Sequence, residues 1–393
     1  MSDLIVIGGG VMGLFTAFHA SERGAEVVVL EQGRIGDPTT ASFGRTRSFR
    51  SDYLDPHYAR LAHEAFRLWG EFEHRTGAEV LVRCGCMNVA KRAVTPELES
   101  TYAQQSFEVL DRLGVSRTES FDALALQRRF PYLDADIAHL EHDAGVVALP
   151  AVTRALAERV RTVEGVTTYE IARHDDGFRV STDSGEHSAR SLVITAGHGT
   201  NAVLELLPGC ELQVPITRDR PREAKYFTPP APDRHRFTAD AMPVIAYLDA
   251  GIYCHPIVDG LVDAVKIGYY NPPDVPRDRT SIDSIASFVE QCMPGLSDAT
   301  ARDVDDVDGC DYDLVADDDF VLGAIPGVEN AYVGVGWRGT GYKFAPWVGR
   351  VLAESAVQGG TVYDIARFDP ARFDERNATD EPPVAQELGT ASR

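Results

Sequence analysis

A glycine-rich segment near the start of the chain has residue types and spacing that could do chemistry. Residues 8–13 read Gly-Gly-Gly-Val-Met-Gly and fit the pattern G-x-G-x-x-G. Gly8 allows a tight turn, Gly10 lets the backbone approach a pyrophosphate, and Gly13 lets a helix pack closely on a strand. The N-terminus of that helix offers free N–H groups and a positive dipole to phosphates. The segment therefore predicts a site for a dinucleotide.

The sequence around this segment supports the same prediction. The apolar run at residues 4–7 comes directly before the glycines, and apolar residues at helical spacing follow them. A second apolar run, residues 27–30, ends at Glu31, 18 residues after Gly13. A carboxylate at this place can accept hydrogen bonds from a ribose. Strand, glycine turn, helix, strand and acid together predict a βαβ unit, which suits NAD as well as FAD.

The rest of the chain predicts a second unit of this kind at the far end, with strand-rich material between. Apolar residues at helical spacing predict helices at residues 57–75, 150–163, 280–293 and 346–358. Alternating or continuous apolar runs predict strands at residues 80–90, 166–171, 178–181, 191–196, 241–268 and 331–336. Because the first and last segments both read as strand, glycine turn and helix, we expect them to meet in one domain. The fold class is α/β (α+β), with a second domain inserted.

Composition narrows the classes of function. The net charge of −22 argues against nucleic acid and anionic membranes as partners, because both are bound by clustered Lys and Arg. No run approaches 18 apolar residues, and the first strand begins at Leu4, which leaves no room for a signal peptide. The six cysteines are scattered and complete no zinc site. We therefore expect a cytoplasmic protein with no metal site and no membrane segment.

Six motifs, in order along the chain, resemble one known family. The first is the glycine segment, and the second is GRTRSFR at residues 44–50, followed by Tyr53 and Asp55. The others are TAG at 195–197, VKIGY at 265–269, CDYD at 310–313 and GWRGTGYKFAP at 336–346. The sequence thus resembles the FAD-dependent amine oxidases of the D-amino acid oxidase-like (DAO) superfamily. Within them it is similar to the monomeric sarcosine oxidase and N-methyltryptophan oxidase group.

The resemblance implies a domain organisation. A Rossmann-like FAD-binding domain of the glutathione-reductase type would comprise residues 1–80, 145–220 and 310–370. A mixed-sheet substrate domain, inserted into it, would comprise residues 81–144 and 221–309. The polar, unpatterned tail at residues 375–393 is expected to be disordered.

The resemblance also implies FAD as the cofactor. In this family a cysteine at the place of Cys310 carries the flavin through a thioether, and the spacing of 33 residues from Cys310 to Lys343 agrees. The alternative is a buried free cysteine, which is the usual state of a cytoplasmic cysteine. We expect the covalent link. The other residues expected to bind FAD are Gly8, Gly10, Met12, Gly13, Glu31, Ser42, Arg45, Thr46, Ile171, Gly197, Gly336, Gly339, Thr340, Gly341 and Lys343.

Four basic residues are expected to act in catalysis. Arg50 and Lys343 would hold an amino acid's carboxylate, since arginine offers a planar fork and lysine adds a second positive charge. For Arg50, which lies in an arginine-rich run, a solvated surface charge is the alternative. Arg47 and Lys266 resemble the basic residues beside the flavin in this family, where positive charge favours the anion formed as O2 accepts an electron. Lys266 interrupts an apolar strand, where a lysine without a function would be costly.

The expected substrate pocket departs from the sarcosine pattern. Besides Arg50 and Lys343, the residues expected to bind substrate are Cys254, Tyr270 and Trp337. Cys254 stands where the family has a tyrosine, Tyr270 stands where it has a histidine, and Thr340 replaces another histidine. Trp337 and Arg338 also differ from the sarcosine form. Because Cys254 and Thr340 are smaller than the residues they replace, we expect a substrate larger than sarcosine.

These inferences predict an oxidase of a secondary amino acid, N-methylated or cyclic, that uses O2 and forms an imine and H2O2. The partners would be the small amine and O2, and the protein would be a monomer or a weak homo-oligomer. Two alternatives stay open: a flavin dehydrogenase that passes electrons to a non-oxygen acceptor, and a non-catalytic flavoprotein. Lys266 speaks against the first, and the pair of Arg50 and Lys343 against the second.

Overall fold

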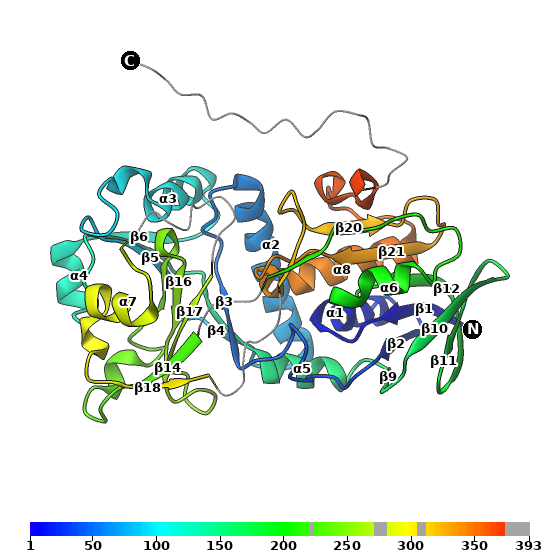
Figure 1. The fold of residues 1–393 in the computed structure, drawn as a ribbon, viewed down its shortest axis with the longest axis horizontal. Coiled ribbons are helices and arrows are strands. Elements are labelled where there is room, and N and C mark those ends of the chain that lie inside the picture. Colours follow the sequence, from blue (N-terminus) through cyan, green and yellow to red (C-terminus); the bar gives the residue numbers. More distant parts are fainter. Residues whose placement is uncertain (220–223, 271–280, 305–311, 374–393) are drawn as a thin grey trace, which may run out of the picture.

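The structure, a computed structural model, describes residues 1–219, 224–270, 281–304 and 312–373. Cys310 and the tail at residues 375–393, for which the sequence predicts disorder, lie outside the described residues. Figure 1 shows two lobes side by side, each built around a large sheet, with the N-terminal βαβ unit and the C-terminal strands in the same lobe. This mixed α/β architecture confirms the predicted fold class.

The first sheet carries the glycine turn. Its centre is β1 (Ser2–Ile7), which pairs in parallel with β2 (Val27–Glu31) and with β12 (Gly185–Ile194). Ile7 lies opposite both Leu30 and Ile194, so the carboxyl ends of the three strands meet at one edge, which is the edge where such sheets bind ligands. The remaining strands of this sheet are β9 (Thr162–Glu164), β10 (Thr168–His174), β11 (Gly177–Thr182), β20 (Val321–Ala324) and β21 (Ala331–Val335).

Helices from both ends of the chain cover this sheet. α1 (Val11–Ser21) packs against α8 (Ala345–Gln358), and the two approach so closely that a Cβ on Gly349 would lie 2.5 Å from Phe15. α2 (Pro56–Thr76) is capped at its N-terminus by Asp55, whose carboxylate accepts a hydrogen bond from His57 N. The other helices of this lobe are α5 (Leu149–Ala157) and α6 (Thr200–Leu204).

The boundary predicted for one helix is wrong. Residues 150–163 read as a single helix, but α5 ends at Ala157 and Val163 belongs to β9. Val163 pairs with Leu30 at the edge of the first sheet. An apolar residue gains burial in either element, so periodicity alone did not separate the helix from the strand.

The second sheet forms the other lobe and draws only on residues 86–141 and 224–303. Its described strands, in spatial order, are β18 (Thr300–Asp303), β14 (Ala224–Thr228), β17 (Val265–Tyr269), β16 (Ile252–His255), β15 (Val244–Tyr247), β5 (Cys86–Ala90), β7 (Ile137–Glu141) and β6 (Thr118–Asp122). Its helices are α3 (Tyr102–Leu113), α4 (Ala123–Arg129) and α7 (Ile285–Cys292). The segments agree with those assigned to a substrate domain, whose boundaries stay a prediction.

Two small sheets complete the described structure. β3 (Thr46–Phe49) and β4 (Leu81–Val82) both pair with β8 (Gly145–Ala148), and β13 (Thr217–Asp219) pairs with β19 (Tyr312–Leu314). Figure 1 shows β3 between the lobes. The arginine-rich segment at residues 44–50 therefore runs where both lobes can contribute residues to one site.

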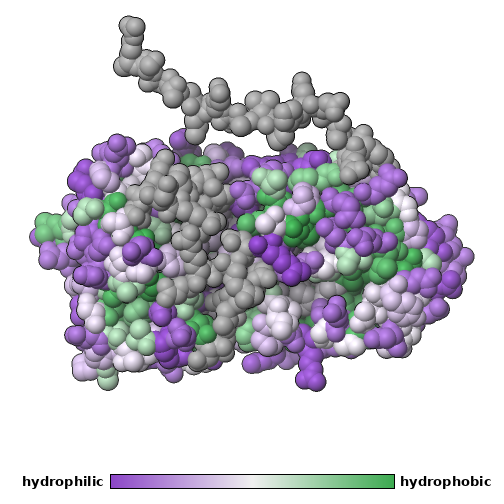
Figure 2. Space-filling view, viewed as in Figure 1, coloured by the Kyte–Doolittle hydropathy of each residue, from purple (hydrophilic) through white to green (hydrophobic). Residues whose placement is uncertain are grey.

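The surface agrees with the acidic composition. Figure 2 shows hydrophilic residues spread over both lobes, with hydrophobic residues in smaller groups between them. No helix in the described part of the chain has both the length and the apolar character needed to span a membrane.

Candidate active site

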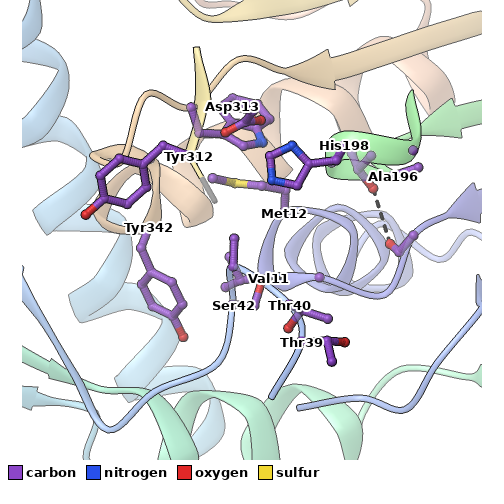
Figure 3. Close-up of a pocket in the computed structure, with 18 of the residues that line it drawn as sticks. Val11, Met12, Thr39, Thr40, Ser42, Ala196, His198, Tyr312, Asp313 and Tyr342 are labelled. Atoms are coloured by element: carbon purple, nitrogen blue, oxygen red, sulfur yellow. Dashed lines mark hydrogen bonds between the residues drawn. The ribbon is translucent and has the colours of Figure 1, made fainter. Parts of the chain in front are cut away.

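A cavity of about 270 Å³ begins at the glycine turn after β1. Figure 3 shows Val11, Met12, Ser42, His198 and Tyr312 among the residues that surround it. The cavity lies at the carboxyl edge of the first sheet, at the N-terminus of α1. A helix N-terminus in this position favours an anionic group such as a phosphate.

The glycines of this turn leave no room for side chains. A Cβ on Gly8, whose φ is +108°, would lie 2.4 Å from the carbonyl oxygen of Thr195. A Cβ on Gly13 would lie 2.0 Å from the carbonyl oxygen of Gly8. At Gly10 the nearest atom is Ser42 Oγ, 3.2 Å away, so a side chain there would occupy space at the start of α1. The backbone is thus bare where a ligand would approach.

Glu31 ends β2 at the wall of the same cavity. Its Oε2 accepts a hydrogen bond from Gly9 N at 2.6 Å, and its Oε1 accepts one from Gly33 N at 2.7 Å. The two bonds hold the carboxylate at the cavity wall, where it can also accept a hydrogen bond from a ribose hydroxyl. Ser42 Oγ accepts a hydrogen bond from Val11 N at 2.9 Å and so caps the first turn of α1.

Two later segments form the opposite wall. Thr195 and Gly197 follow β12, and Gly197 has a φ of +55°. The loop after β21 supplies Gly339 and Gly341. A Cβ on Gly339 would lie 2.7 Å from the ring of Tyr312, and one on Gly341 would lie 2.5 Å from Trp337. Because neither glycine has a side chain, Tyr312 and Trp337 can pack directly against the backbone of this wall.

These features fit an extended dinucleotide such as FAD. The bare helix N-terminus suits a pyrophosphate, and the fixed carboxylate of Glu31 suits a ribose. The far end of the cavity leads to a second one, because Arg47, Tyr312 and Gly339 line both. A group held along the first cavity would therefore reach the second.

The second cavity has a volume of about 60 Å³ and lies between the lobes. Arg50 and Lys343, which come from opposite ends of the chain, both line it and are both buried. Tyr270 also lines it, as the sequence predicted for a substrate contact. The structure thus brings together the proposed carboxylate-binding pair on one small cavity.

Lys343 lies in a short 3-10 helix, η6 (Gly341–Phe344), and is held by two hydroxyl groups. Its Nζ donates to Thr340 Oγ1 at 2.6 Å and to Tyr53 Oη at 2.8 Å. Burial, and after it the charge of Arg50, lower the pKa of Lys343 to about 7. An anionic ligand beside Lys343 would favour its charged form again.

Arg50 is held along one edge only. Its Nη1 donates to Asp52 Oδ1 at 2.5 Å, to the carbonyl oxygen of Asp52 at 2.8 Å and to Tyr102 Oη at 3.5 Å. Its guanidinium carbon lies 5.0 Å from the centre of the Tyr53 ring. Within the described part of the chain, Nε and Nη2 make no hydrogen bond. These two donors form the edge of a guanidinium that matches a carboxylate.

The prediction that Cys254 contacts substrate is wrong. Cys254 is fully buried in the core of the second lobe, where its Sγ lies 3.8 Å from Met293 Sδ. Its neighbours on β16, Tyr253 and His255, line the second cavity instead. Successive side chains of a strand point to opposite faces. An assignment that is wrong by one residue therefore assigns to the cavity a side chain that lies in the core.

Lys266 is buried on β17, opposite His255 on β16. Lys266 does not line the second cavity, but His255 does, and the charge of Lys266 acts on His255. Burial, followed by the charges of Lys266 and Arg47, lowers the pKa of His255 well below its usual value. His255 Nδ1 lies 2.8 Å from Thr46 Oγ1. Thr46 therefore orients a neutral imidazole.

Several residues predicted to bind the cofactor lie elsewhere. Arg45 is exposed, Ile171 is buried in the core beneath the first sheet, and the N–H of Gly336 donates to Asp313 Oδ2 at 3.0 Å. None of these residues, nor Thr46, lines the first cavity. Thr340 and Lys343, also predicted to bind cofactor, line the second cavity and not the first. Trp337, predicted to bind substrate, lines the first cavity and not the second.

Some residues of the cavities had no role predicted from the sequence. Tyr312 lines both cavities, His198 lines the first, and Tyr253 lines the second. The alternation along residues 252–255 is the one signal that could have placed Tyr253 with His255. For His198 and Tyr312 the sequence holds no such signal, because their positions depend on packing between distant segments.

Comparison with known proteins agrees with this geometry. The DAO family, described as FAD dependent oxidoreductase, matches residues 3–355. The chain is 30% identical to monomeric sarcosine oxidase of Streptomyces avermitilis, over 94% of this chain and 97% of that one. It is 29% identical to the peroxisomal sarcosine oxidase of Homo sapiens, over 94% and 96%. The structure of L-proline dehydrogenase from P. horikoshii superposes with a TM-score of 0.76 at 20% identity, covering 95% and 97%.

The match covers nearly all of the described chain and includes both the glycine turn and the segment with Lys343. The cavity at the N-terminus of α1 and the carboxylate of Glu31 independently fit the cofactor that this family uses. The chain therefore belongs to the DAO family of FAD-dependent oxidoreductases.

Proposed function

We propose that this protein is an FAD-dependent oxidase of a secondary amino acid, with O2 as the acceptor and H2O2 as the second product. The observation that carries the proposal is the placement of Arg50 and Lys343, both buried, on a small cavity that continues into the cavity fitting FAD. The sarcosine oxidases with which the chain shares 29–30% identity support an N-substituted amino acid as substrate.

The side chains around the second cavity account for binding and orientation. Arg50 would bind the substrate's carboxylate through Nε and Nη2, while Lys343 would bind it through Nζ. A carboxylate held at two points fixes the direction of the amine and of the C–H bond beside it. FAD, when bound, would supply the capacity to accept two electrons from that C–N unit.

The same surroundings favour oxidation over other reactions of the amine. The cavity is small, and the rings of Tyr253 and Tyr270 form part of its lining, so a bound substrate would displace most of the water from the reacting bond. An amine gives up its electrons only in the neutral form, so the substrate's ammonium group must lose a proton as it binds. His255 is neutral, and its Nε2 has no partner among the described residues. In the tautomer whose Nδ1–H donates to Thr46 Oγ1, Nε2 is able to accept a hydrogen bond from the amine.

A buried positive charge beside the cavity supports O2 as the acceptor. Lys266 lies beside His255, and Arg47 lines both cavities. Fixed positive charge stabilises the superoxide anion that forms as O2 accepts one electron. This feature favours an oxidase over the alternative of a flavin dehydrogenase.

A visible spectrum of the purified protein tests the proposal. We expect a flavin spectrum that bleaches without oxygen on addition of sarcosine, N-methyl-L-tryptophan, L-proline or L-pipecolate, and one H2O2 formed per substrate oxidised in air. Bleaching without H2O2 would identify a dehydrogenase. No bleaching with any secondary amino acid would support a non-catalytic flavoprotein.

Covalent attachment through Cys310 belongs to the same proposal and has its own test. After acid precipitation the yellow colour should stay with the protein pellet. Cys310→Ala should release the colour into the supernatant, whereas Cys210→Ala, a change at a half-buried cysteine outside both cavities, should not. Colour in the supernatant of the unaltered protein would refute the covalent link and leave the FAD site in place.

A further inference from the structure

A third cavity of about 80 Å³ adjoins the second one. Tyr270 lines both cavities, so the two meet at this residue. Among the described residues, the Tyr270 hydroxyl makes no hydrogen bond. The third cavity is lined by tyrosine rings, by two arginines, Arg338 and Arg367, and by four aspartates, Asp55, Asp317, Asp318 and Asp319.

Arg338 is held in place by its backbone and by one terminal nitrogen. Its N–H donates to the Asp313 carbonyl oxygen at 2.9 Å, and its Nη1 donates to the Asp318 carbonyl oxygen at 2.6 Å. Its φ of +48° is unusual for a residue with a side chain, and such backbone strain gathers at functional sites. The sequence had already marked Arg338 as a departure from the sarcosine pattern.

The remaining donors of Arg338 are open. Its Nε is buried and has no hydrogen-bond partner in the described part of the chain, and its Nη2 makes no hydrogen bond there either. A buried, unsatisfied donor on a charged group is costly and calls for an acceptor. Nε and Nη2 together form the edge that binds a carboxylate with two parallel hydrogen bonds.

Three of the four carboxylates of this cavity each have a cationic partner. Arg367 donates to Asp55 at 2.6 Å and to Asp319 at 2.7 Å, and Arg372 donates to Asp317 at 2.7 Å. The charge of the fourth carboxylate, Asp318, favours the charged form of Arg338. Among the described residues Arg338 makes no ion pair, and its Nε and Nη2 remain available as donors.

We propose that the second and third cavities hold one substrate, whose first carboxylate binds Arg50 and Lys343 and whose second carboxylate binds Arg338. This inference rests on the proposed function and names its substrate class, a secondary amino acid with an anionic side chain. Tyr270 lies where the two cavities meet, and its ring can pack against the apolar chain that joins the two carboxylates. Arg338 is then a specificity-determining residue for the reaction.

Matched substrates test this inference. N-methyl-L-glutamate and its neutral isostere N-methyl-L-glutamine differ only in the charge of the distal group, and the aspartate and asparagine pair tests a shorter chain. For at least one pair, we expect kcat/KM to favour the acid by about tenfold or more, the usual effect of a charge-assisted fork. Arg338→Gln should remove the preference by raising KM for the acid, with little change for the amide.

Two further variants control the result. Arg338→Lys keeps the charge but loses the fork, so it should restore part of the preference. Arg117→Gln removes the same charge from an exposed site and should leave the preference intact. The inference is overturned if the unaltered enzyme shows no preference in either pair, or if Arg338→Gln lowers kcat/KM for acid and amide alike.

A binding measurement separates this inference from the proposed function. Glutarate and its monoamide are compared by the shift in melting temperature of the FAD-loaded protein. A larger shift with glutarate that disappears in Arg338→Gln would support the two carboxylate sites even if no amino acid is oxidised. If secondary amino acids are oxidised but both ligands shift the melting temperature equally, the further inference fails and the proposed function stands.

Discussion

Arg50 Nη1 donates a hydrogen bond to Asp52 Oδ1 at 2.5 Å, and both side chains are buried. Asn88 Nδ2 donates to the other oxygen of Asp52. Burial raises the pKa of Asp52, while the charge of Arg50 opposes that shift. Arg50 therefore reaches the cavity with one edge held by a carboxylate of the protein and the other open to a ligand.

Replacing Asp52 by Asn should destabilise the protein, because Arg50 would remain as a buried charge without a counterion. Removing one partner of a buried ion pair costs about 3 kcal/mol or more, which urea denaturation would measure. A carboxylate ligand such as 2-furoate should recover more stability in Asp52→Asn than in the unaltered protein, because it neutralises Arg50.

The matched control is Asp143→Asn, which breaks the ion pair with Arg117, a side chain that is 77% exposed. Solvent screens that pair, so the loss should be much smaller. Equal losses in the two variants would show that the buried pair does not carry the stability assigned to it.

Carboxylate binding should weaken as pH rises, because the pKa of Lys343 is lowered to about 7 by burial and by Arg50. A carboxylate binds the charged form of Lys343, which predominates below this pKa and is lost as pH rises through it. Affinity for 2-furoate, followed by the change in the flavin spectrum, should therefore fall between about pH 6 and pH 9. Lys343→Met should lower the affinity and flatten its pH dependence, whereas equal pH dependence in both proteins would contradict the assignment.

Gly13→Ala should prevent FAD binding, because the added Cβ would lie 2.0 Å from the carbonyl oxygen of Gly8. We expect the variant to purify with less than about a tenth of the normal FAD content, since the glycine turn could not keep its close packing. Gly70→Ala is the control, because Gly70 also lies in a helix, α2, but a Cβ there would meet nothing within 4 Å. A full FAD content in Gly13→Ala would show that this turn does not shape the site.

Lys266→Met should slow the reaction with O2 by about a hundredfold, the usual effect of removing one group that stabilises a developing anion. Bleaching of the flavin by substrate without oxygen should change little, because the carboxylate-binding pair is intact. An oxygen electrode and an anaerobic spectrum measure the two steps separately. Lys225→Met on the neighbouring strand β14, with a side chain 32% exposed, should alter neither. A parallel loss of both steps would mean that Lys266 acts on substrate binding.

Local pattern predicted the parts of the fold that depend on neighbours in sequence. The glycine turn, β1, β2, α2 and α8 follow from apolar spacing and glycines, both of which act over a few residues. The sequence alone therefore placed Gly8, Gly10 and Glu31 around the first cavity, and the fold class followed from the repetition of such units.

Side-chain direction and long-range pairing were decided by the tertiary structure. Whether Cys254 or its neighbours reach the cavity depends on which face of β16 the second sheet buries. A shift of one residue along the strand would exchange the side chains that face the core and those that face the cavity. The meeting of Arg50 with Lys343 on one cavity, and the position of Arg338 on a cavity shared with Tyr270, depend on how distant segments of the chain pack. The sequence by itself determined which groups can bind a dinucleotide and a carboxylate, because backbone turns and residue types are local. Only the packing of distant segments decided which of those groups share a cavity.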